Sequence, residues 1–136
     1  MRLLVSCVPY DCGKSGISVY VREVVKSLAA QGNELTLICE PGVDGILPAD
    51  VPHSVMHAPR WTSRAVLSMV WHLFILPFFI QRHRHDFDGF VICAANRRVC
   101  AWYPICTTAT VHDLANFHIP GKYSRMRMFY LARVLP

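Results

Sequence analysis

Residues 2–39 have the sequence RLLVSCVPYDCGKSGISVYVREVVKSLAAQGNELTLIC, and this stretch decides the fold. Its first part, 2–8, is an apolar, β-rich run that stops at a glycine-containing turn, which is typical of a buried strand. From Ile17 the period changes, and apolar side chains recur on one helix face at Ile17, Val21, Val24, Val25 and Leu28. Ser15 suits the N-cap of this helix, and Gly32 suits the position after its last turn. A second apolar run at 35–39 completes a strand–helix–strand unit, whose strands are expected to run parallel.

The remainder of the chain continues the alternation of strands and helices. We expect, in order, loop 41–52, strand 55–57, helix 65–80, strand 89–93, loop or short helix 94–105, strand 107–111 and helix 123–135. This order predicts a single α/β domain over 1–136, with a mainly parallel sheet and flanking helices. Because the chain stops at Pro136, at or within a helix that has no capping glycine, we expect it to be truncated.

Composition excludes several classes of protein. The 136 residues are 53% hydrophobic and 17% charged, which excludes a disordered chain, a collagen and a coiled coil. The net charge is +5, and basic residues without acidic neighbours concentrate in two stretches, 60–84 and 114–136. Such patches suit a phosphate-bearing ligand, an anionic lipid or a nucleic acid, and composition does not separate the three.

The six cysteines raise the question of a disulfide or zinc framework. None of them forms a C-x-x-C pair, and most lie in apolar, strand-like runs. We interpret them as reduced, mostly buried thiols of a cytosolic protein, and no metal is expected. The apolar run that follows Arg2 agrees, because it is too short for a signal peptide and ends at Pro9.

The segment 65–80, AVLSMVWHLFILPFFI, is nearly all apolar and has three interpretations. As a helix it spans about 24 Å, less than the roughly 30 Å of a bilayer core. It is a buried core helix, an interfacial helix, or a membrane span. The interfacial interpretation places Trp71 and Phe78–Phe79 among lipid headgroups, with Arg82 and Arg84 on the phosphates.

Two polar segments follow predicted strands, where open α/β sheets bind their ligands. The first is the turn before the first helix, in which Gly13 and Gly16 allow close backbone approach and the helix N-terminus attracts an anion. Gly-Lys-Ser suggests a P-loop, but Val8 stands where that motif requires its first glycine. We interpret Gly13, Lys14, Ser15 and Gly16 as a phosphate-capable turn, with a purely structural turn as the alternative.

The second segment is 110–114, TVHDL, at the end of a β-branched strand. A histidine that emerges there, His112, can donate to a sugar or phosphate oxygen or exchange a proton with it. Asp113 can orient a neighbouring group, and an ordinary turn is again the alternative. The sequence has no nucleophile with an evident base.

Together these segments resemble the N-terminal part of a family 4 retaining glycosyltransferase. The resemblance rests on GISVYVRE at 16–23, LAAQGNELTL at 28–37 and TVHDL at 110–114, followed by Phe117, His118 and a basic, aromatic helix. It spans the chain and implies the GT-B architecture, in which two Rossmann-like domains face each other across a cleft. This chain would be the N-terminal, acceptor-side half.

The resemblance also implies roles for residues and partners. His112 would act as a catalytic residue beside the transferred hexose, with Asp113 supporting its loop, while 13–16 and His118 would contact substrate. The donor would be a nucleotide diphosphate sugar, with no other cofactor, and the acceptor a glycan or lipid-linked molecule rather than a nucleic acid. A C-terminal domain would hold the donor through a Glu-x7-Glu pattern. This chain lacks that pattern, so the domain alone is expected to be inactive.

Such a domain is expected in the cytoplasm, docked peripherally to the inner face of the membrane through 65–84 and 122–133. Two other classes of function remain open. One is a non-catalytic Rossmann-like module that binds a phosphate ligand or a partner. The other is a membrane-surface or interaction protein built around the apolar helix.

Overall fold

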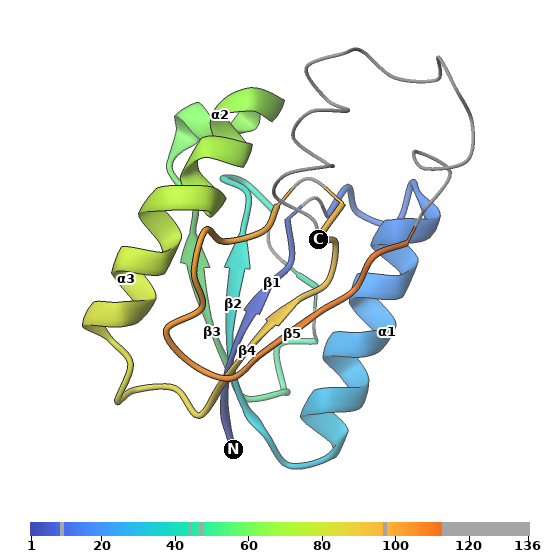
Figure 1. Cartoon of the computed structure of the whole chain (residues 1–136). Helices are drawn as coiled ribbons and strands as arrows, with labels where there is room; N and C mark the ends of the chain where they lie inside the picture. Colours follow the sequence, from blue (N-terminus) through green and yellow to red (C-terminus); the bar gives the residue numbers. More distant parts are fainter. Residues whose placement is uncertain (9, 44, 47, 97, 113–136) are drawn as a thin grey trace.

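The computed structural model describes residues 1–8, 10–43, 45–46, 48–96 and 98–112. Within them, five strands form one parallel sheet in the order β3-β2-β1-β4-β5 (Figure 1). The strands are β1 (Arg2–Ser6), β2 (Glu34–Cys39), β3 (His53–His57), β4 (Gly89–Ile92) and β5 (Thr107–Ala109). This is the Rossmann-like α/β fold that the sequence predicts, and the sheet is parallel throughout the described strands. The carboxyl ends of all five strands therefore meet at one edge.

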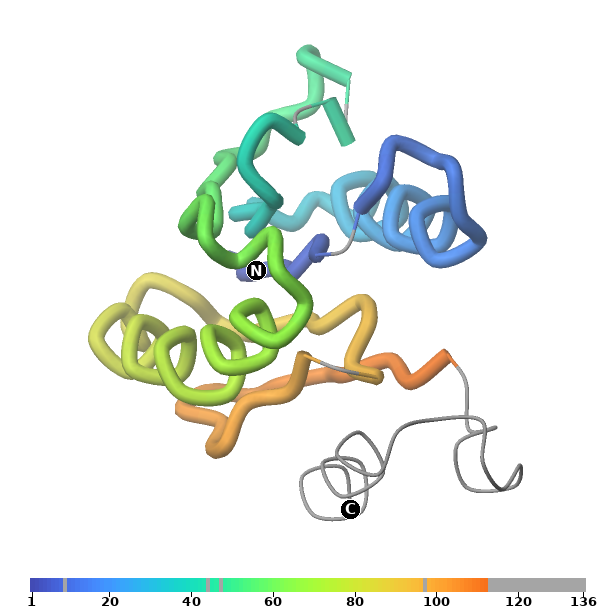
Figure 2. The backbone as a smooth tube through the Cα atoms, turned by 90° about the horizontal axis from the view of Figure 1, so that it is seen from above, coloured from blue at the N-terminus to red at the C-terminus, as the bar shows by residue number. Residues whose placement is uncertain are grey.

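Helices cover both faces of the sheet. They are α1 (Gly16–Ala30), a 3₁₀ turn η1 (Arg60–Ser63), α2 (Ala65–Val70), a π-helical turn η2 (Trp71–Ile75) and α3 (Leu76–Arg82). Figure 2 shows the sheet from above, with α1 on one side and the α2–η2–α3 helix on the other. Side chains of β1 alternate between the two layers: Leu3 and Val5 pack with α1, and Leu4 packs with the other helix.

The ends of α1 are those that the sequence predicts. The Ser15 hydroxyl accepts the Ser18 N–H at 3.2 Å, which caps the first turn. Gly32 has φ +76°, the left-handed conformation that ends a helix at little cost for glycine. Between the ends, Val21 and Val25 are fully buried, so the predicted apolar face is the one that packs on the sheet.

The apolar segment forms one continuous helix that widens in its middle. Pro77 has no N–H to donate to the carbonyl of Leu73, four residues before it, and the helix adopts a π-turn there. The N–H of Ala101 donates to the Leu73 oxygen at 2.9 Å instead. The loop between β4 and β5 is thereby fastened to the helix, and no helix forms within the described part of 94–105.

One histidine lies inside this layer. His72 is fully buried; its Nδ1–H donates to the Ser68 carbonyl at 2.8 Å, so Nε2 accepts from the Ser6 hydroxyl at 3.2 Å. Burial lowers the pKa of His72 to about 3, and the neighbouring charge of Arg98 acts in the same direction. The imidazole is therefore neutral at physiological pH and serves as a polar tie between β1 and the helix.

The opposite face of the helix is exposed and apolar. Val66, Val70, Phe74 and Phe78 follow one another at a spacing of four and form what we call the apolar stripe. Val66 is 58% exposed and Phe78 is 67% exposed. The 65–82 helix is long and apolar enough to cross a membrane by length and composition, with 33% of it buried in the domain.

The interfacial interpretation is wrong for one of its residues. Trp71 was expected among lipid headgroups, but it is 5% exposed and packs in the core with Leu76 and Ile80. Trp71 lies on the face of the helix that packs against the sheet, and this face is apolar as well. The segment is thus a core helix on one face and an exposed apolar surface on the other.

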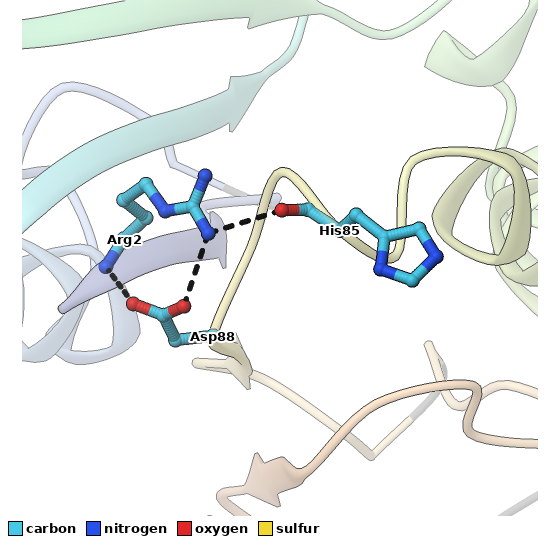
Figure 3. Close-up of polar contacts among 3 residues, drawn as sticks. All are labelled: Arg2, His85 and Asp88. Atoms are coloured by element: carbon cyan, nitrogen blue, oxygen red, sulfur yellow. Dashed lines mark hydrogen bonds and ion pairs between the residues drawn. The ribbon is translucent and has the colours of Figure 1, made fainter.

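At the opposite, amino edge of the sheet, Arg2 joins β1 to the segment before β4 (Figure 3). Its main-chain N–H donates to Asp88 at 2.7 Å, and its guanidinium donates to Asp88 and to the His85 carbonyl. Hydrogen bonds from Arg2, chiefly from its main chain, lower the pKa of Asp88. These hydrogen bonds link β1 to the segment before β4 at the amino edge of the sheet.

All six cysteines are free thiols. Four of them, Cys7, Cys39, Cys93 and Cys100, are buried, in line with the interpretation of most of them as small apolar core residues. Burial raises the pKa of Cys93 and of Cys100 to about 12, which keeps both thiols protonated and unreactive.

Candidate functional site

The two segments singled out in the sequence lie at the same edge of the sheet, and Tyr20 of α1 links them. The Tyr20 hydroxyl lies 2.9 Å from Oγ1 of Thr110, just beyond β5. The ring of Tyr20 meets the imidazole of His112 edge-on, with ring centroids 4.6 Å apart and planes at 84°. In Figure 1 the end of the described chain accordingly rises beside α1. Gly16 begins α1 one turn before Tyr20, about 6 Å along the helix axis.

His112 is held from the β4 side as well. Its main-chain N–H donates to Oδ1 of Asn96 at 3.0 Å, and its Nε2 lies 2.7 Å from the carbonyl oxygen of Cys93. A carbonyl only accepts, so Nε2 carries a hydrogen and the neutral ring has its lone pair on Nδ1. The side chain is half-buried, which leaves it accessible from this edge.

The turn before α1 is closed by its own side chains. The Asp11 carboxylate accepts the N–H groups of Lys14 and Ser15, at 2.9 and 3.1 Å. The Ser18 hydroxyl accepts those of Asp11 and Gly13, at 3.2 and 2.9 Å. Desolvation acts to raise the pKa of Asp11, but the hydrogen bonds from Ser15, Ser18 and Lys14 together lower it. A fixed negative charge therefore already caps this turn.

This arrangement changes what the turn offers to a ligand. Of the predicted residues Gly13, Lys14, Ser15 and Gly16, the first three use their N–H groups within the turn. The N–H groups of Gly16 and Ile17 make no hydrogen bond in the described part of the chain. They and the exposed Lys14 side chain are the groups available to an anion.

Two predicted site residues, Asp113 and His118, lie outside the described residues. Within the residues described, no group of three or more histidine, cysteine, aspartate or glutamate side chains is arranged to hold a metal ion.

Sequence reasoning missed three of the groups at this site: Tyr20, Asn96 and the Cys93 carbonyl. Asn96 carried a usable signal, since it is a polar residue soon after a buried strand, as His112 is. Tyr20 carried a weaker one, since it lies off the buried face of α1, at 36% exposure. A main-chain carbonyl leaves no trace in the sequence.

A pocket formed by described residues lies away from these segments. It has a volume of about 330 Å³ and lies between the end of α1 and the loop before β3, lined by Lys26, Ala29, Ala30, Pro48, Asp50, Val51 and Pro52. This is the amino edge of the sheet, whereas ligands of doubly wound sheets bind at the carboxyl edge. We therefore place the candidate site at His112 and the turn before α1.

A doubly wound parallel sheet with a helix N-terminus and a histidine at its carboxyl edge defines a Rossmann-like ligand-binding domain. The model of Glycosyltransferase Family 4 matches residues 14–136, so the chain belongs to that family. The matched region includes α1, Tyr20 and His112. No curated protein and no solved structure matches the chain.

Proposed function

We propose that this chain is the acceptor-side half of a retaining glycosyltransferase of the GT-B architecture. The complete enzyme would transfer a hexose from a nucleotide diphosphate sugar to a glycan or lipid-linked acceptor. In that reaction the bond between the anomeric carbon and the diphosphate breaks, a bond to the acceptor hydroxyl forms, and that hydroxyl loses its proton. The observation that carries the proposal is the contact of Tyr20 with His112, which brings the two candidate segments to one edge.

In this proposal the two segments have different tasks. His112 hydrogen-bonds the transferred sugar, with Asp113 and His118 supporting and contacting it as the family resemblance implies. The N–H groups of Gly16 and Ile17, which make no hydrogen bond to another described residue, attract the negatively charged diphosphate together with Lys14. Hydrogen-bonding groups held rigidly before the reaction stabilise developing charge without having to reorganise.

The proposal includes a donor-binding domain in addition to residues 1–136. Half a cleft buries little ligand surface, so we expect weak binding and no transfer by the domain alone. Its free thiols suit a reducing compartment, and we propose a cytoplasmic location.

A titration with a panel of nucleotide diphosphate sugars tests the proposal. We expect amide chemical-shift changes at Gly16, Ile17 and His112, with Ala30 at the opposite edge unchanged. Shifts near Ala30 alone would contradict it, because they would place the ligand in the pocket at the amino edge of the sheet, between the end of α1 and the loop before β3. Equal shifts with inorganic phosphate would favour the alternative, a phosphate-binding module without sugar transfer.

A second proposal concerns the apolar stripe. We propose that it docks on the inner, anionic face of a membrane, where an acceptor of the lipid-linked class resides. Arg60 and Arg64 precede the stripe, and Arg82 and Arg84 follow it, with no acidic residue between positions 59 and 86. Phenylalanines embed in the headgroup region while arginines pair with lipid phosphates. The ring of Phe78 meets that of Trp102 edge-on, with ring centroids 4.7 Å apart, and this pair extends the surface toward the β4–β5 loop.

A further inference from the structure

We infer that Tyr20 is a positioning residue that fixes the orientation of His112, so that Nδ1 is the ring nitrogen offered to the sugar. The inference rests on the proposed function for the identity of the ligand. It rests on the described contacts alone for the orientation of the ring.

The first step is the anchoring of the other nitrogen. The Nε2–H of His112 donates to the Cys93 carbonyl at 2.7 Å, a short bond to the end of β4. The main-chain N–H of the same residue donates to Asn96 at 3.0 Å. Both bonds pull His112 toward the segment after β4. A flip of the ring would put a carbon in place of Nε2 and leave the Cys93 carbonyl without this donor.

The second step is the restraint from the opposite side. Tyr20 contacts two side chains of the segment that follows β5. Its ring packs against His112, and its hydroxyl lies 2.9 Å from Oγ1 of Thr110. Thr110 is itself fixed, because its main-chain N–H donates to Ile92 at 2.9 Å. Tyr20 is carried by α1, which is anchored next to it by the fully buried Val21. The imidazole is therefore held between α1 and β4.

The third step is what remains free. Nδ1 of His112 has no hydrogen-bond partner within the described residues. When neutral it accepts a hydrogen bond from a hydroxyl, and when protonated it donates one. A sugar hydroxyl can take either part, so the geometry assigns Nδ1 as the atom that contacts the transferred sugar.

Nitrogen-15 spectra of the imidazole, recorded on the chain without ligand, test this orientation. We expect the neutral His112 ring to be a single tautomer, protonated at Nε2, with that proton protected from exchange. Tyr20→Ala should raise the exchange rate of the Nε2 proton at least ~10-fold, the change expected when about 1.4 kcal/mol of restraint is lost. Tyr20→Phe keeps the ring contact and should restore most of the protection. Val19→Ala, at the neighbouring exposed position, should leave the spectrum unchanged.

Two results would overturn the inference: a His112 ring protonated at Nδ1 in the unaltered chain, or identical spectra for the chain and its Tyr20→Ala variant. Circular dichroism of each variant checks that the fold is kept. Because no ligand is present, these spectra are independent of the proposed function. If nucleotide sugars fail to bind, the proposed function fails while the orientation result stands.

Discussion

The N–H of Ala101 donates a 2.9 Å hydrogen bond to the carbonyl oxygen of Leu73, at the point where Pro77 has no N–H to offer. The loop that carries Ala101 also holds His112, through the Cys93 carbonyl and Asn96. One loop therefore contacts the apolar helix at one end and the candidate site at the other. The helix and the site are parts of a single packed unit.

Replacing Pro77 by alanine should loosen this loop. Alanine restores a main-chain donor four residues after Leu73, which then competes with Ala101 for the same oxygen. We expect hydrogen exchange of the Ala101 amide to become several-fold faster. The Gly32 amide, bonded at 2.9 Å to Ala29 far from this loop, serves as the control. Unchanged exchange at Ala101 would contradict the role given to Pro77.

The neutral, buried His72 should make the domain sensitive to acid. Its pKa is about 3 in the folded chain and about 6.5 when exposed, so below pH 6.5 the unfolded chain binds the proton first. The stabilising contribution of His72 is therefore present above pH 6.5 and is lost as the pH falls below that value. Between pH 7 and pH 5 the free energy of unfolding should drop by about 2 kcal/mol from this residue. Urea denaturation at several pH values measures the drop.

A matched variant isolates this contribution. In the double variant Ser6→Ala, His72→Phe both partners of the buried hydrogen bond become apolar, which limits the cost of an unsatisfied group. Its stability should vary less between pH 7 and pH 5 than that of the unaltered chain. An equal slope in both proteins would rule out His72 as the source.

Removing the carboxylate of Asp11 should strengthen anion binding at the turn. Asp11→Ala frees the N–H groups of Lys14 and Ser15 and removes a negative charge from the helix N-terminus. We expect a nucleotide diphosphate to bind at least ~5-fold more tightly in an NMR titration. Asp11→Asn, which keeps an accepting oxygen without the charge, should lie between the two. Weaker binding to Asp11→Ala would show that the carboxylate supports the ligand instead of competing with it.

The apolar stripe should govern binding to anionic vesicles. Phe74→Ser combined with Phe78→Ser should reduce cosedimentation with vesicles containing phosphatidylglycerol by ~10-fold or more, since each phenylalanine contributes roughly 1.5–3 kcal/mol when fully buried. Val19→Ser, an exposed apolar residue on α1, is the control and should bind normally. Equal binding by the double variant would rule out the apolar stripe as the vesicle-binding surface. A concentration-dependent dimer that is lost in that variant would instead identify a second copy of the chain as the partner of the stripe.

The alternation of periods in the sequence was sufficient to predict the β1–α1–β2 unit, its Ser15 cap and the parallel sheet. These features depend on local sequence, because a glycine after the last apolar position of a helix, or apolar residues spaced three or four apart, are compatible with few local structures. The boundaries of β5 were less well predicted: it ends at Ala109 and not at position 111. Thr110 and its neighbour are β-branched, and the Thr110 N–H still donates to Ile92, but β4 ends at that residue and no described strand continues beside position 111.

The site was predictable only in part, since two of its features depend on tertiary contacts. Nothing local to Asp11 indicates that its carboxylate takes up the N–H groups expected to bind phosphate. Nothing local to Tyr20 indicates that it reaches across 90 residues of sequence to Thr110. Trp71 shows the same limit, because which face of an almost wholly apolar helix is buried is decided by the sheet that it covers.

In a complete transferase that contains this domain, His112→Ala should lower kcat at least ~100-fold, as expected for a positioned hydrogen-bonding or proton-transfer group. Near-normal turnover would remove His112 from the site. Denaturation curves of the variant separate this effect from a loss of folding.

Intermolecular nuclear Overhauser effects with a bound nucleotide diphosphate sugar test the central claim most directly. We predict cross-peaks between protons of the hexose and the rings of His112 and Tyr20, because both rings border the proposed sugar site. Cross-peaks to Ala30 and Val51 at the opposite edge, without any to His112, would contradict the account.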